Sequence, residues 1–191
     1  RLVTEVMLPN NYEGVGGLTG IPGTVGGAVF MNAGTVNGTT DQWVQTVEMI
    51  SPQGRCIKEV KEGDYSYRGQ QFCPRGSLIL AARFQFQRAN ADQRTIYEHY
   101  LRRRKEKQPQ GYCCGSVFKN PPGDHAARLI EACGLKGQRH GGAIISPMHA
   151  NFIMNEDNAT AEDILALIHL CKARVKEKFG IDLEEEVVIV S

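Results

Sequence analysis

Long runs of apolar residues are missing from this sequence, and so is a strong net charge. No stretch approaches the roughly 18 consecutive apolar residues of a membrane-spanning helix, and no basic segment followed by an apolar one opens the chain. Over its 191 residues the formal net charge is only +1. Such a balance disfavours bulk electrostatic binding to nucleic acid or anionic lipid. We therefore expect a soluble, cytoplasmic protein with no nucleic acid and no membrane among its partners.

Paired cysteine motifs are absent as well. The six cysteines show neither a CxxC pair nor the cysteine and histidine spacing of a metal centre. We expect no metal, and reduced thiols at most of these positions. Cys113 and Cys114 differ, because they directly precede a candidate functional motif. A disulfide between these two neighbours would be strained.

The chain also lacks an initiating methionine. It opens at Arg1, and residues 2–8, Leu-Val-Thr-Glu-Val-Met-Leu, already alternate in the manner of a strand. We expect the chain to be the later part of a longer protein.

Glycine is plentiful, and its richest stretch is residues 20–34, GIPGTVGGAVFMNAG. Glycines there let the backbone take positive φ and come close to a ligand. Thr24 is expected to cap a helix that runs through Ala28 and Met31 and stops at Gly34. A glycine-rich turn at a helix N-terminus suits a phosphate or pyrophosphate. The alternative is a tight turn before a closely packed helix, because the spacing matches neither GxGxxG nor GxxxxGK[ST].

The first half of the chain predicts an α+β arrangement. Residues 44–50 and 55–60 alternate around a Ser-Pro-Gln-Gly turn and predict an antiparallel hairpin. A loop at 63–69 and a strand at 77–86 follow. Residues 90–107 predict a helix with a polar start and a basic end. Its run of basic residues at 102–105 either grips a phosphate or forms a solvated helix face.

The second half predicts a smaller α/β unit, and we place the boundary so that the domains are residues 1–89 and 90–191. A short helix at 126–133 precedes short strands at 143–145 and 152–154. Thr160 and Asp163 resemble a capping box for a helix that Gly180 ends. Its core face, by helical spacing, consists of Ile164, Ile168, Cys171, Val175 and Phe179. A final strand is expected over residues 183–190.

Three sites carry candidate chemistry, each weak by itself. In Gly-Ser-Val-Phe-Lys-Asn-Pro, residues 115–121, a loop presents Ser116 while Lys119 and Asn120 hold an anionic or hydroxylated group. The alternative for Ser116 is an ordinary loop serine. In Tyr-Ser-Tyr-Arg, residues 65–68, Arg68 can stabilise negative charge on a carboxylate or enolate, or simply lie on the surface beside tyrosine.

The third site is the acidic run at Glu184, Glu185 and Glu186. Strand alternation puts Glu186 on one face and Glu185 on the other. A carboxylate forced toward an apolar face has a raised pKa and can act as an acid. Alternation does not choose between the two, and a solvated strand entry is the alternative.

Together these motifs resemble the UDP-N-acetylenolpyruvoylglucosamine reductase (UDP-N-acetylmuramate dehydrogenase) family. The order GIPGTVGGAVFMNAG, YR, GSVFKNP, LIEACGLKG, HANFIMN, ATAEDI and FGIDLEEEV runs from about Gly14 to Val187. The short spacing between YR and GSVFKNP matches the compact type of the enzyme. The family's opening third, with its first flavin lobe, has no counterpart in this chain.

The resemblance implies an oxidoreductase, a flavoprotein of peptidoglycan synthesis with roles in cell wall biogenesis, cell shape, cell division and the cell cycle. FAD reduced by NADPH would pass a hydride to UDP-N-acetylglucosamine-enolpyruvate, giving UDP-N-acetylmuramate. By similarity Ser116 protonates the enolic intermediate, while Arg68 and Glu186 polarise the carboxylate. Tyr67, Lys119 and Asn120 resemble substrate-binding positions. The segment matching the family's flavin contact is Gly20, Ile21, Pro22, Gly23, Thr24, Val25, Gly26 and Gly27.

The implied fold is the remainder of a vanillyl-alcohol-oxidase-like FAD-binding domain, followed by a small α/β substrate-binding domain. The sequence departs from the family's pattern at Gly16, which replaces a common glutamate, and at Gln70, where a serine is usual. Cys113 and Cys114 stand in place of small or polar residues. A second function class stays open, namely a non-catalytic sugar-nucleotide-binding fragment that holds no flavin.

Overall fold

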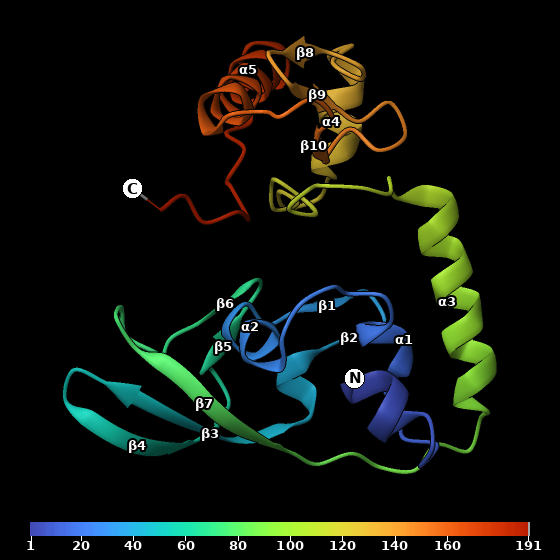
Figure 1. Ribbon diagram of the computed structural model, residues 1–191, viewed down its shortest axis with the longest axis vertical. Helices are drawn as coiled ribbons and strands as arrows, with labels where there is room; N and C mark the ends of the chain where they lie inside the picture. The colour runs from blue at the N-terminus through green and yellow to red at the C-terminus, as the bar shows by residue number, and fades with distance from the viewer. Residues whose placement is uncertain (191) are drawn as a thin grey trace. The chain divides into compact units, whose positions relative to one another are not determined.

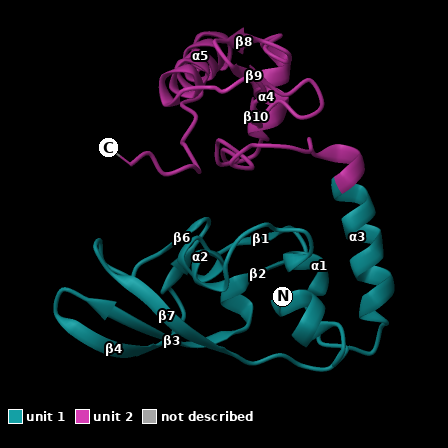
Figure 2. Ribbon diagram, viewed as in Figure 1, with its two compact units in different colours: residues 1–104 teal, residues 105–191 magenta. Residues whose placement is uncertain are grey.

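The computed structural model describes residues 1–190, which form two units divided inside helix α3 (Gln93–Lys107). The division lies between Arg104 and Lys105 (Figure 2). It therefore falls within the helix, whereas the sequence placed a boundary ahead of it, between residues 89 and 90. The helix itself is confirmed, and the carboxylate of Asp92 accepts hydrogen bonds from the backbone N–H groups of its first turn. The assignment of a flavin part and a substrate part to residues 1–89 and 90–191 stays a prediction.

The central sheet of unit 1 has the strand order β4-β3-β7, and all its pairs are antiparallel. Its strands are β3 (Val44–Ser51), β4 (Gly54–Glu59) and β7 (Leu78–Phe84). The predicted hairpin is therefore confirmed, with Ser51 opposite Gly54 at its turn. Helix α2 (Val25–Phe30) lies beside this sheet (Figure 1), and apolar side chains of α2, β3 and β7 pack together in one cluster.

The glycine-rich stretch forms α2, preceded by the single turn α1 (Val15–Leu18). The Thr24 hydroxyl accepts a hydrogen bond from the Gly27 N–H, which confirms the predicted cap. The helix ends at Phe30, four residues before Gly34, so the predicted stop is wrong. Asn32 ends it instead, because this residue takes a left-handed φ of 45°.

Short elements follow α2 and complete unit 1. Strands β1 (Gly34–Thr35) and β2 (Gly38–Thr39) pair with each other, and the 3₁₀ turn η2 (Thr40–Gln42) leads into the central sheet. Strands β5 (Tyr65–Ser66) and β6 (Gly69–Gln70) form a tight hairpin where the sequence predicted only a loop. The turn of this hairpin consists of Tyr67 and Arg68.

Residues 2–8 do not form the predicted strand. They form a π-helix, η1 (Leu2–Met7), in which the Leu8 N–H donates to the Val3 carbonyl over 2.9 Å. Met7 is buried in the core of unit 1, and Leu2, Val3 and Leu8 pack against the same cluster. Their spacing places these residues on one helical face. The apparent alternation arose from Val6, which is exposed.

Unit 2 contains a sheet of order β10-β9-β8 beside two helices. The strands are β8 (Arg139–His140), β9 (Ala143–Ile145) and β10 (Ile153–Asn155), and the helices are α4 (Ala126–Ala132) and α5 (Ala161–Phe179). The capping box of Thr160 and Asp163 is present, and Gly180 ends α5 with a φ of 71°. The predicted apolar face of α5 packs into the core of this unit.

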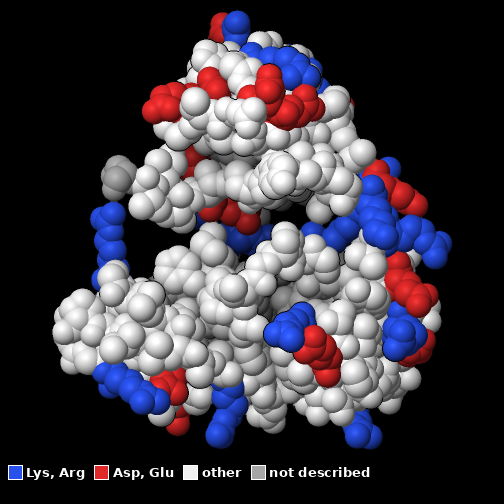
Figure 3. Space-filling model, viewed as in Figure 1, with Lys and Arg blue, Asp and Glu red and all other residues white. Residues whose placement is uncertain are grey.

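The chain end corrects another expectation. Residues 183–190 are irregular, not a strand, apart from one isolated bridge between Glu185 and Phe118. Helices and sheets are thus mixed in both units, which agrees with the coarse α+β prediction. On the face drawn in Figure 3, positive and negative side chains are interspersed. Among residues 1–190, no helix is both long and apolar enough to span a membrane.

Candidate functional site

The glycine-rich loop before α2 presents bare backbone. Residues 22–25 are exposed, and Gly20 and Gly23 have φ values of 69° and 141°. A Cβ added at Gly23 would meet no atom within 4 Å. By contrast, a Cβ at Gly17 would lie 2.6 Å from the Gly38 carbonyl oxygen. The glycine at position 17 is therefore needed for packing, whereas the one at position 23 serves the turn and leaves its outer side open.

The basic run at 102–105 is not uniformly solvated. Arg104 is partly buried, and burial lowers the pKa of its guanidinium, whereas Arg102 and Arg103 are exposed. A Cβ at Gly20 would lie only 2.7 Å from the Arg104 side chain, so this side chain lies against the glycine-rich loop. The sequence did not separate Arg104 from its neighbours, because helical spacing alone does not say which basic residue meets another segment.

Arg68 lies at the tip of the β5–β6 hairpin and is held from two sides. Its Nη2 atom donates to the Gly34 carbonyl over 3.0 Å, and its guanidinium stacks 5.1 Å from the centroid of the Tyr67 ring. The backbone of Arg68 has a φ of 56°, which is uncommon for a residue with a side chain. Tyr67 is 52% exposed. The two predicted residues are therefore brought together, with the cation oriented by a backbone carbonyl.

Neighbouring residues of this hairpin are structural. Burial, and then the charges of Asp41 and Asp64, raise the pKa of Tyr65, so its phenol stays protonated. Gln70, which stands where the family usually has serine, accepts hydrogen bonds from the backbone N–H groups of Phe72 and Cys73. Its amide thus shapes the turn after β6.

In unit 2, the segment that carries Ser116 is clamped by Asn151. The Asn151 side chain accepts from the Phe118 N–H over 2.9 Å and donates to the Phe118 carbonyl over 2.8 Å. Its own carbonyl accepts from the Val117 N–H over 2.9 Å. Ser116 is partly buried and follows Gly115, whose φ is 81°. Asn151 was missed as a functional position, although it lies within the motif HANFIMN.

The same segment brings Glu186 beside Ser116 in the fold. The Glu186 N–H donates to the Val117 carbonyl over 2.8 Å, so residue 186 bonds directly to the neighbour of Ser116. The Lys119 N–H donates to the Glu184 carbonyl over 2.9 Å, which continues this pairing. Two of the three predicted catalytic residues are thus on adjacent segments of one unit. Arg68 belongs to the other unit.

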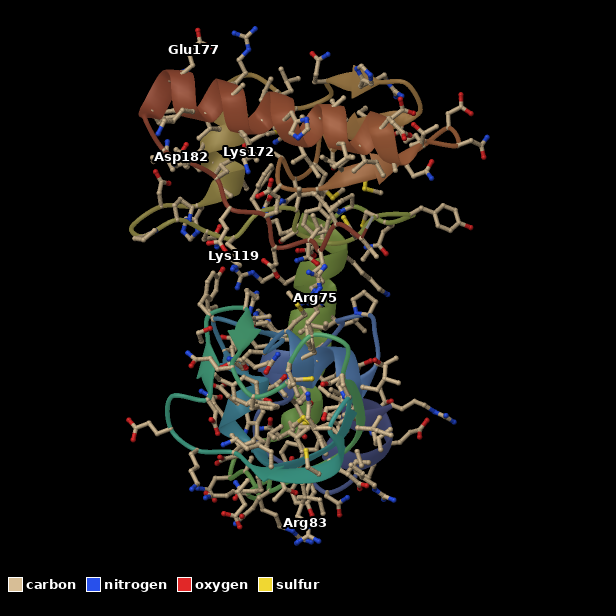
Figure 4. All side chains as sticks on the ribbon, turned by 90° about the vertical axis from the view of Figure 1, so that its left-hand side faces the viewer. Arg75, Arg83, Lys119, Lys172, Glu177 and Asp182 are labelled. Carbon is tan, nitrogen blue, oxygen red and sulfur yellow. The ribbon has the colours of Figure 1, made fainter. Side chains whose placement is uncertain are left out.

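The three acidic residues have different surroundings. Glu184 forms an ion pair with Lys119 over 2.5 Å, and Glu185 forms one with Lys172 of α5 over 2.6 Å; both lysines are labelled in Figure 4. The hydrogen bond from Lys172 lowers the pKa of Glu185, so the idea of a raised pKa at this position is wrong. Glu186 is partly buried and carries the backbone bond to Val117.

Asn120 has a structural contact of its own. Its Oδ1 atom accepts from the Ala126 N–H over 3.1 Å, at the first residue of α4. The bond ties the loop after Lys119 to a helix start. An amide at this position is therefore explained in part by the fold, in addition to any contact with a ligand.

Comparison with known proteins gives consistent matches. The family model described as the C-terminal domain of UDP-N-acetylenolpyruvoylglucosamine reductase matches residues 107–190. A curated relative of that name from Clostridium novyi (strain NT) is 43% identical over 192 residues, which cover 99% of this chain and 62% of the relative. One from Coxiella burnetii (strain Dugway 5J108-111) is 45% identical over 173 residues, covering 90% of this chain and 55% of the relative.

A solved structure agrees with these matches. The UDP-N-acetylenolpyruvylglucosamine reductase of Thermus caldophilus is 37% identical to this chain, with a TM-score of 0.84. The match covers 98% of this chain and 67% of that one. The chain thus spans less than two thirds of the two curated relatives, and its described fold is that of the corresponding part of the solved enzyme. The chain belongs to the UDP-N-acetylenolpyruvoylglucosamine reductase family.

Proposed function

We propose that this chain forms part of a cytoplasmic reductase that converts UDP-N-acetylglucosamine-enolpyruvate to UDP-N-acetylmuramate in peptidoglycan synthesis. FAD, reduced by NADPH, would supply the hydride that the enolpyruvyl group receives. The proposal is supported by membership of the family and by what the residues of this chain offer a flavin and a carboxylate substrate.

The observation that carries the cofactor proposal is Gly26. It lies inside α2, where a glycine is about 1 kcal/mol less favourable than alanine. Its φ is not positive, and an added Cβ would meet no atom nearer than 3.9 Å. Packing within the described residues therefore gives no reason for a glycine here. A flat or charged ligand that approaches the backbone from outside would give such a reason. The exposed loop of residues 22–25 directly precedes Gly26 and could contact the same ligand.

The residues proposed to hold FAD are those of the exposed loop and the first turn of α2. With no side chain on the glycines, backbone N–H groups can meet phosphate oxygens or the ring edge directly. The chain suits this role at Gly23, where an added Cβ would meet no atom within 4 Å, and at Gly26, where it would meet none nearer than 3.9 Å. The set consists of Gly20, Ile21, Pro22, Gly23, Thr24, Val25, Gly26 and Gly27.

The proposed catalytic roles follow from the charge that the reaction builds. Addition of a hydride to the enolpyruvyl group puts negative charge on a fragment that already carries a carboxylate. Arg68 would balance this charge through its fixed guanidinium, and Glu186 would act on the same carboxylate group. Ser116 would deliver the proton to the adjacent carbon. The direct backbone bond between residues 186 and 117 supports a shared position for Glu186 and Ser116.

Substrate binding is proposed for Tyr67, Lys119 and Asn120. Tyr67 exposes its ring and hydroxyl beside Arg68, which suits contact with a sugar or phosphate. Lys119 already pairs with Glu184, whose side chain is 72% exposed, so an incoming diphosphate would compete with a weak surface partner. Lys119 could therefore exchange its ion pair with Glu184 for one with the diphosphate.

Replacement of Ser116 by alanine in the full-length reductase tests the mechanism. Reduction of the flavin by NADPH should continue, while turnover of the enolpyruvyl substrate should slow by about 10² or more, the usual contribution of a positioned acid. Ser77→Ala is the control, because the Ser77 hydroxyl is buried without a hydrogen-bond partner among the described residues. Equal loss of both half-reactions in Ser116→Ala would mean that this serine is structural.

The alternative is a sugar-nucleotide-binding fragment that holds no flavin, and it is favoured by the share of the relatives that this chain spans, 62% and 55%. Visible absorbance of the purified chain separates the two functions. A flavin spectrum that NADPH bleaches supports the reductase. A colourless chain that gains flavin only when the relatives' N-terminal part is supplied means that the reductase assignment applies to the longer parent protein. A chain that binds the sugar nucleotide and takes up no flavin even then supports the fragment.

A further inference from the structure

The end of helix α2 depends on the backbone of Asn32. This residue has a φ of 45°, and beyond it the Ala33 N–H donates to the Ala28 carbonyl over 2.8 Å. That bond and the left-handed residue before it form the usual helix ending in which glycine or asparagine is preferred. The backbone role of Asn32 is thus explained by local structure.

The side chain of Asn32 does something else. It is 4% exposed, and it joins two segments that are distant in sequence. Its Nδ2 atom donates to the Ser66 carbonyl over 3.1 Å, and its Oδ1 atom accepts from the Asp41 N–H over 3.0 Å. Ser66 is the last residue of β5 before the turn that carries Arg68. The amide therefore fixes the base of that hairpin.

A second tie fixes the tip of the hairpin. The Arg68 guanidinium donates to the Gly34 carbonyl over 3.0 Å. Gly34 packs closely against β2, because a Cβ at this position would lie 2.3 Å from the Gly38 carbonyl oxygen and 2.6 Å from the Thr39 Cα. Both anchors of the hairpin, Asn32 and Gly34, thus follow directly after α2.

We propose that Asn32 is a positioning residue for Arg68. Its amide and the Gly34 carbonyl hold the base and the tip of the Arg68 hairpin on the segment that leaves α2, so that the guanidinium and the glycine-rich loop keep a fixed relation. Deletion of the amide removes the tie at the base of the hairpin and lets the hairpin move. The consequence for catalysis rests on the proposed function, in which Arg68 balances charge on the substrate.

Asn32→Gly in the full-length reductase isolates the side chain. Glycine keeps the left-handed helix ending and removes only the two amide hydrogen bonds. The matched control is Asn158→Gly, at an exposed asparagine with a φ of 49°. Hydrogen exchange followed by mass spectrometry reports on the backbone amides of residues 65–70, with β3 as the internal reference.

Amides of residues 65–70 should exchange about tenfold faster in Asn32→Gly, because, of the two lost bonds, the one to the Ser66 carbonyl holds this hairpin, and tenfold corresponds to about 1.4 kcal/mol. Exchange in β3 should not change, and Asn158→Gly should match the parent protein. Unchanged exchange at 65–70, or equal acceleration throughout unit 1, overturns the positioning role.

Activity then links the hairpin to the reaction. Asn32→Gly should slow the step with the enolpyruvyl substrate about tenfold, leave flavin reduction by NADPH within about twofold, and add nothing further in an Arg68→Ala background. Additive losses contradict action through Arg68. If Arg68→Ala leaves the substrate step intact while residues 65–70 still exchange faster in Asn32→Gly, the proposed catalytic role of Arg68 fails and the positioning of its hairpin stands.

Discussion

Replacement of Asn151 by alanine is expected to destabilise unit 2 and to loosen the segment that carries Ser116. Asn151 is buried, and its amide pairs with both backbone groups of Phe118, over 2.9 and 2.8 Å. Phe118 is itself only 1% exposed, so neither group can turn to solvent. Alanine removes both partners at once.

The magnitude follows from these two groups. A buried donor or acceptor left without a partner costs about 1–3 kcal/mol, which gives about 2–6 kcal/mol for the pair. We expect about 2–4 kcal/mol, because water can enter the space that the amide leaves and satisfy part of the loss. Asn155→Ala is the control. The partly buried Asn155 side chain accepts one bond, from the Ala159 N–H over 2.9 Å, and its loss should cost about 1 kcal/mol.

Native-state hydrogen exchange supplies the measurement. The slowest amides of α5 report the opening of unit 2, and those of β3 report unit 1 independently. Asn151→Ala should reduce the opening free energy in α5 by the stated amount and leave β3 unchanged. An effect no larger than that of Asn155→Ala would refute the assignment of two buried bonds to Asn151.

Asn151→Asp sharpens the test through pH. Aspartate keeps an oxygen for the Phe118 N–H, but its second oxygen faces the Phe118 carbonyl in place of the amide donor. Burial raises the pKa of such a carboxyl, and once protonated it donates to that carbonyl as the amide did. The deficit relative to the parent protein should therefore shrink as the pH falls from about 8 to about 5. A deficit that is the same across this range would contradict the proposed contacts.

Other substitutions test the glycines and the carboxylates. Gly34→Ala should destabilise unit 1 by more than about 3 kcal/mol through its clash with the neighbouring strand, whereas Gly26→Ala should stabilise α2 by up to about 1 kcal/mol in urea unfolding and yet weaken flavin binding by the full-length reductase. Gly26→Ala that retains flavin would contradict the cofactor proposal. The pKa of Asp163 is lowered by backbone hydrogen bonds in its capping box, and that of Glu185 by Lys172. The unfolded chain takes up these protons at higher pH than the folded one, so the two carboxylates stabilise unit 2 fully above their ordinary pKa. This stabilisation should be lost as the pH falls from there through the lowered pKa of the folded chain. Asp163→Asn should make the urea midpoint depend less on pH.

Local signals made much of the fold predictable. The hairpin of β3 and β4 follows from alternation around one turn, and the caps at Thr24 and Thr160 each need only a residue within one helical turn. Residues 2–8 misled for the opposite reason. A seven-residue stretch fits alternation and helical spacing almost equally, and the choice depended on the core around Met7, which local sequence does not contain.

The roles of Asn32 and Asn151 could not be predicted from the sequence for a related reason. Asn32 bonds to Ser66, and Asn151 bonds to Phe118, across 34 and 33 residues. The local sequence around either residue does not indicate its hydrogen-bond partner. Both are buried amides with both ends satisfied, which is a property of the folded chain only. The residues proposed to contact substrate can be recognised from motifs, whereas these buried asparagines cannot.

The acidic run shows why register could not be settled by alternation. A strand would have placed Glu184 and Glu186 on one face and Glu185 on the other. Instead the irregular chain end forms backbone hydrogen bonds with residues 117–119, and the acidic residues differ in which neighbours they contact. Lys119 forms an ion pair with Glu184, and Lys172 forms one with Glu185. Glu186 is the one whose backbone bonds beside Ser116, and this supports the same residue that motif register selects.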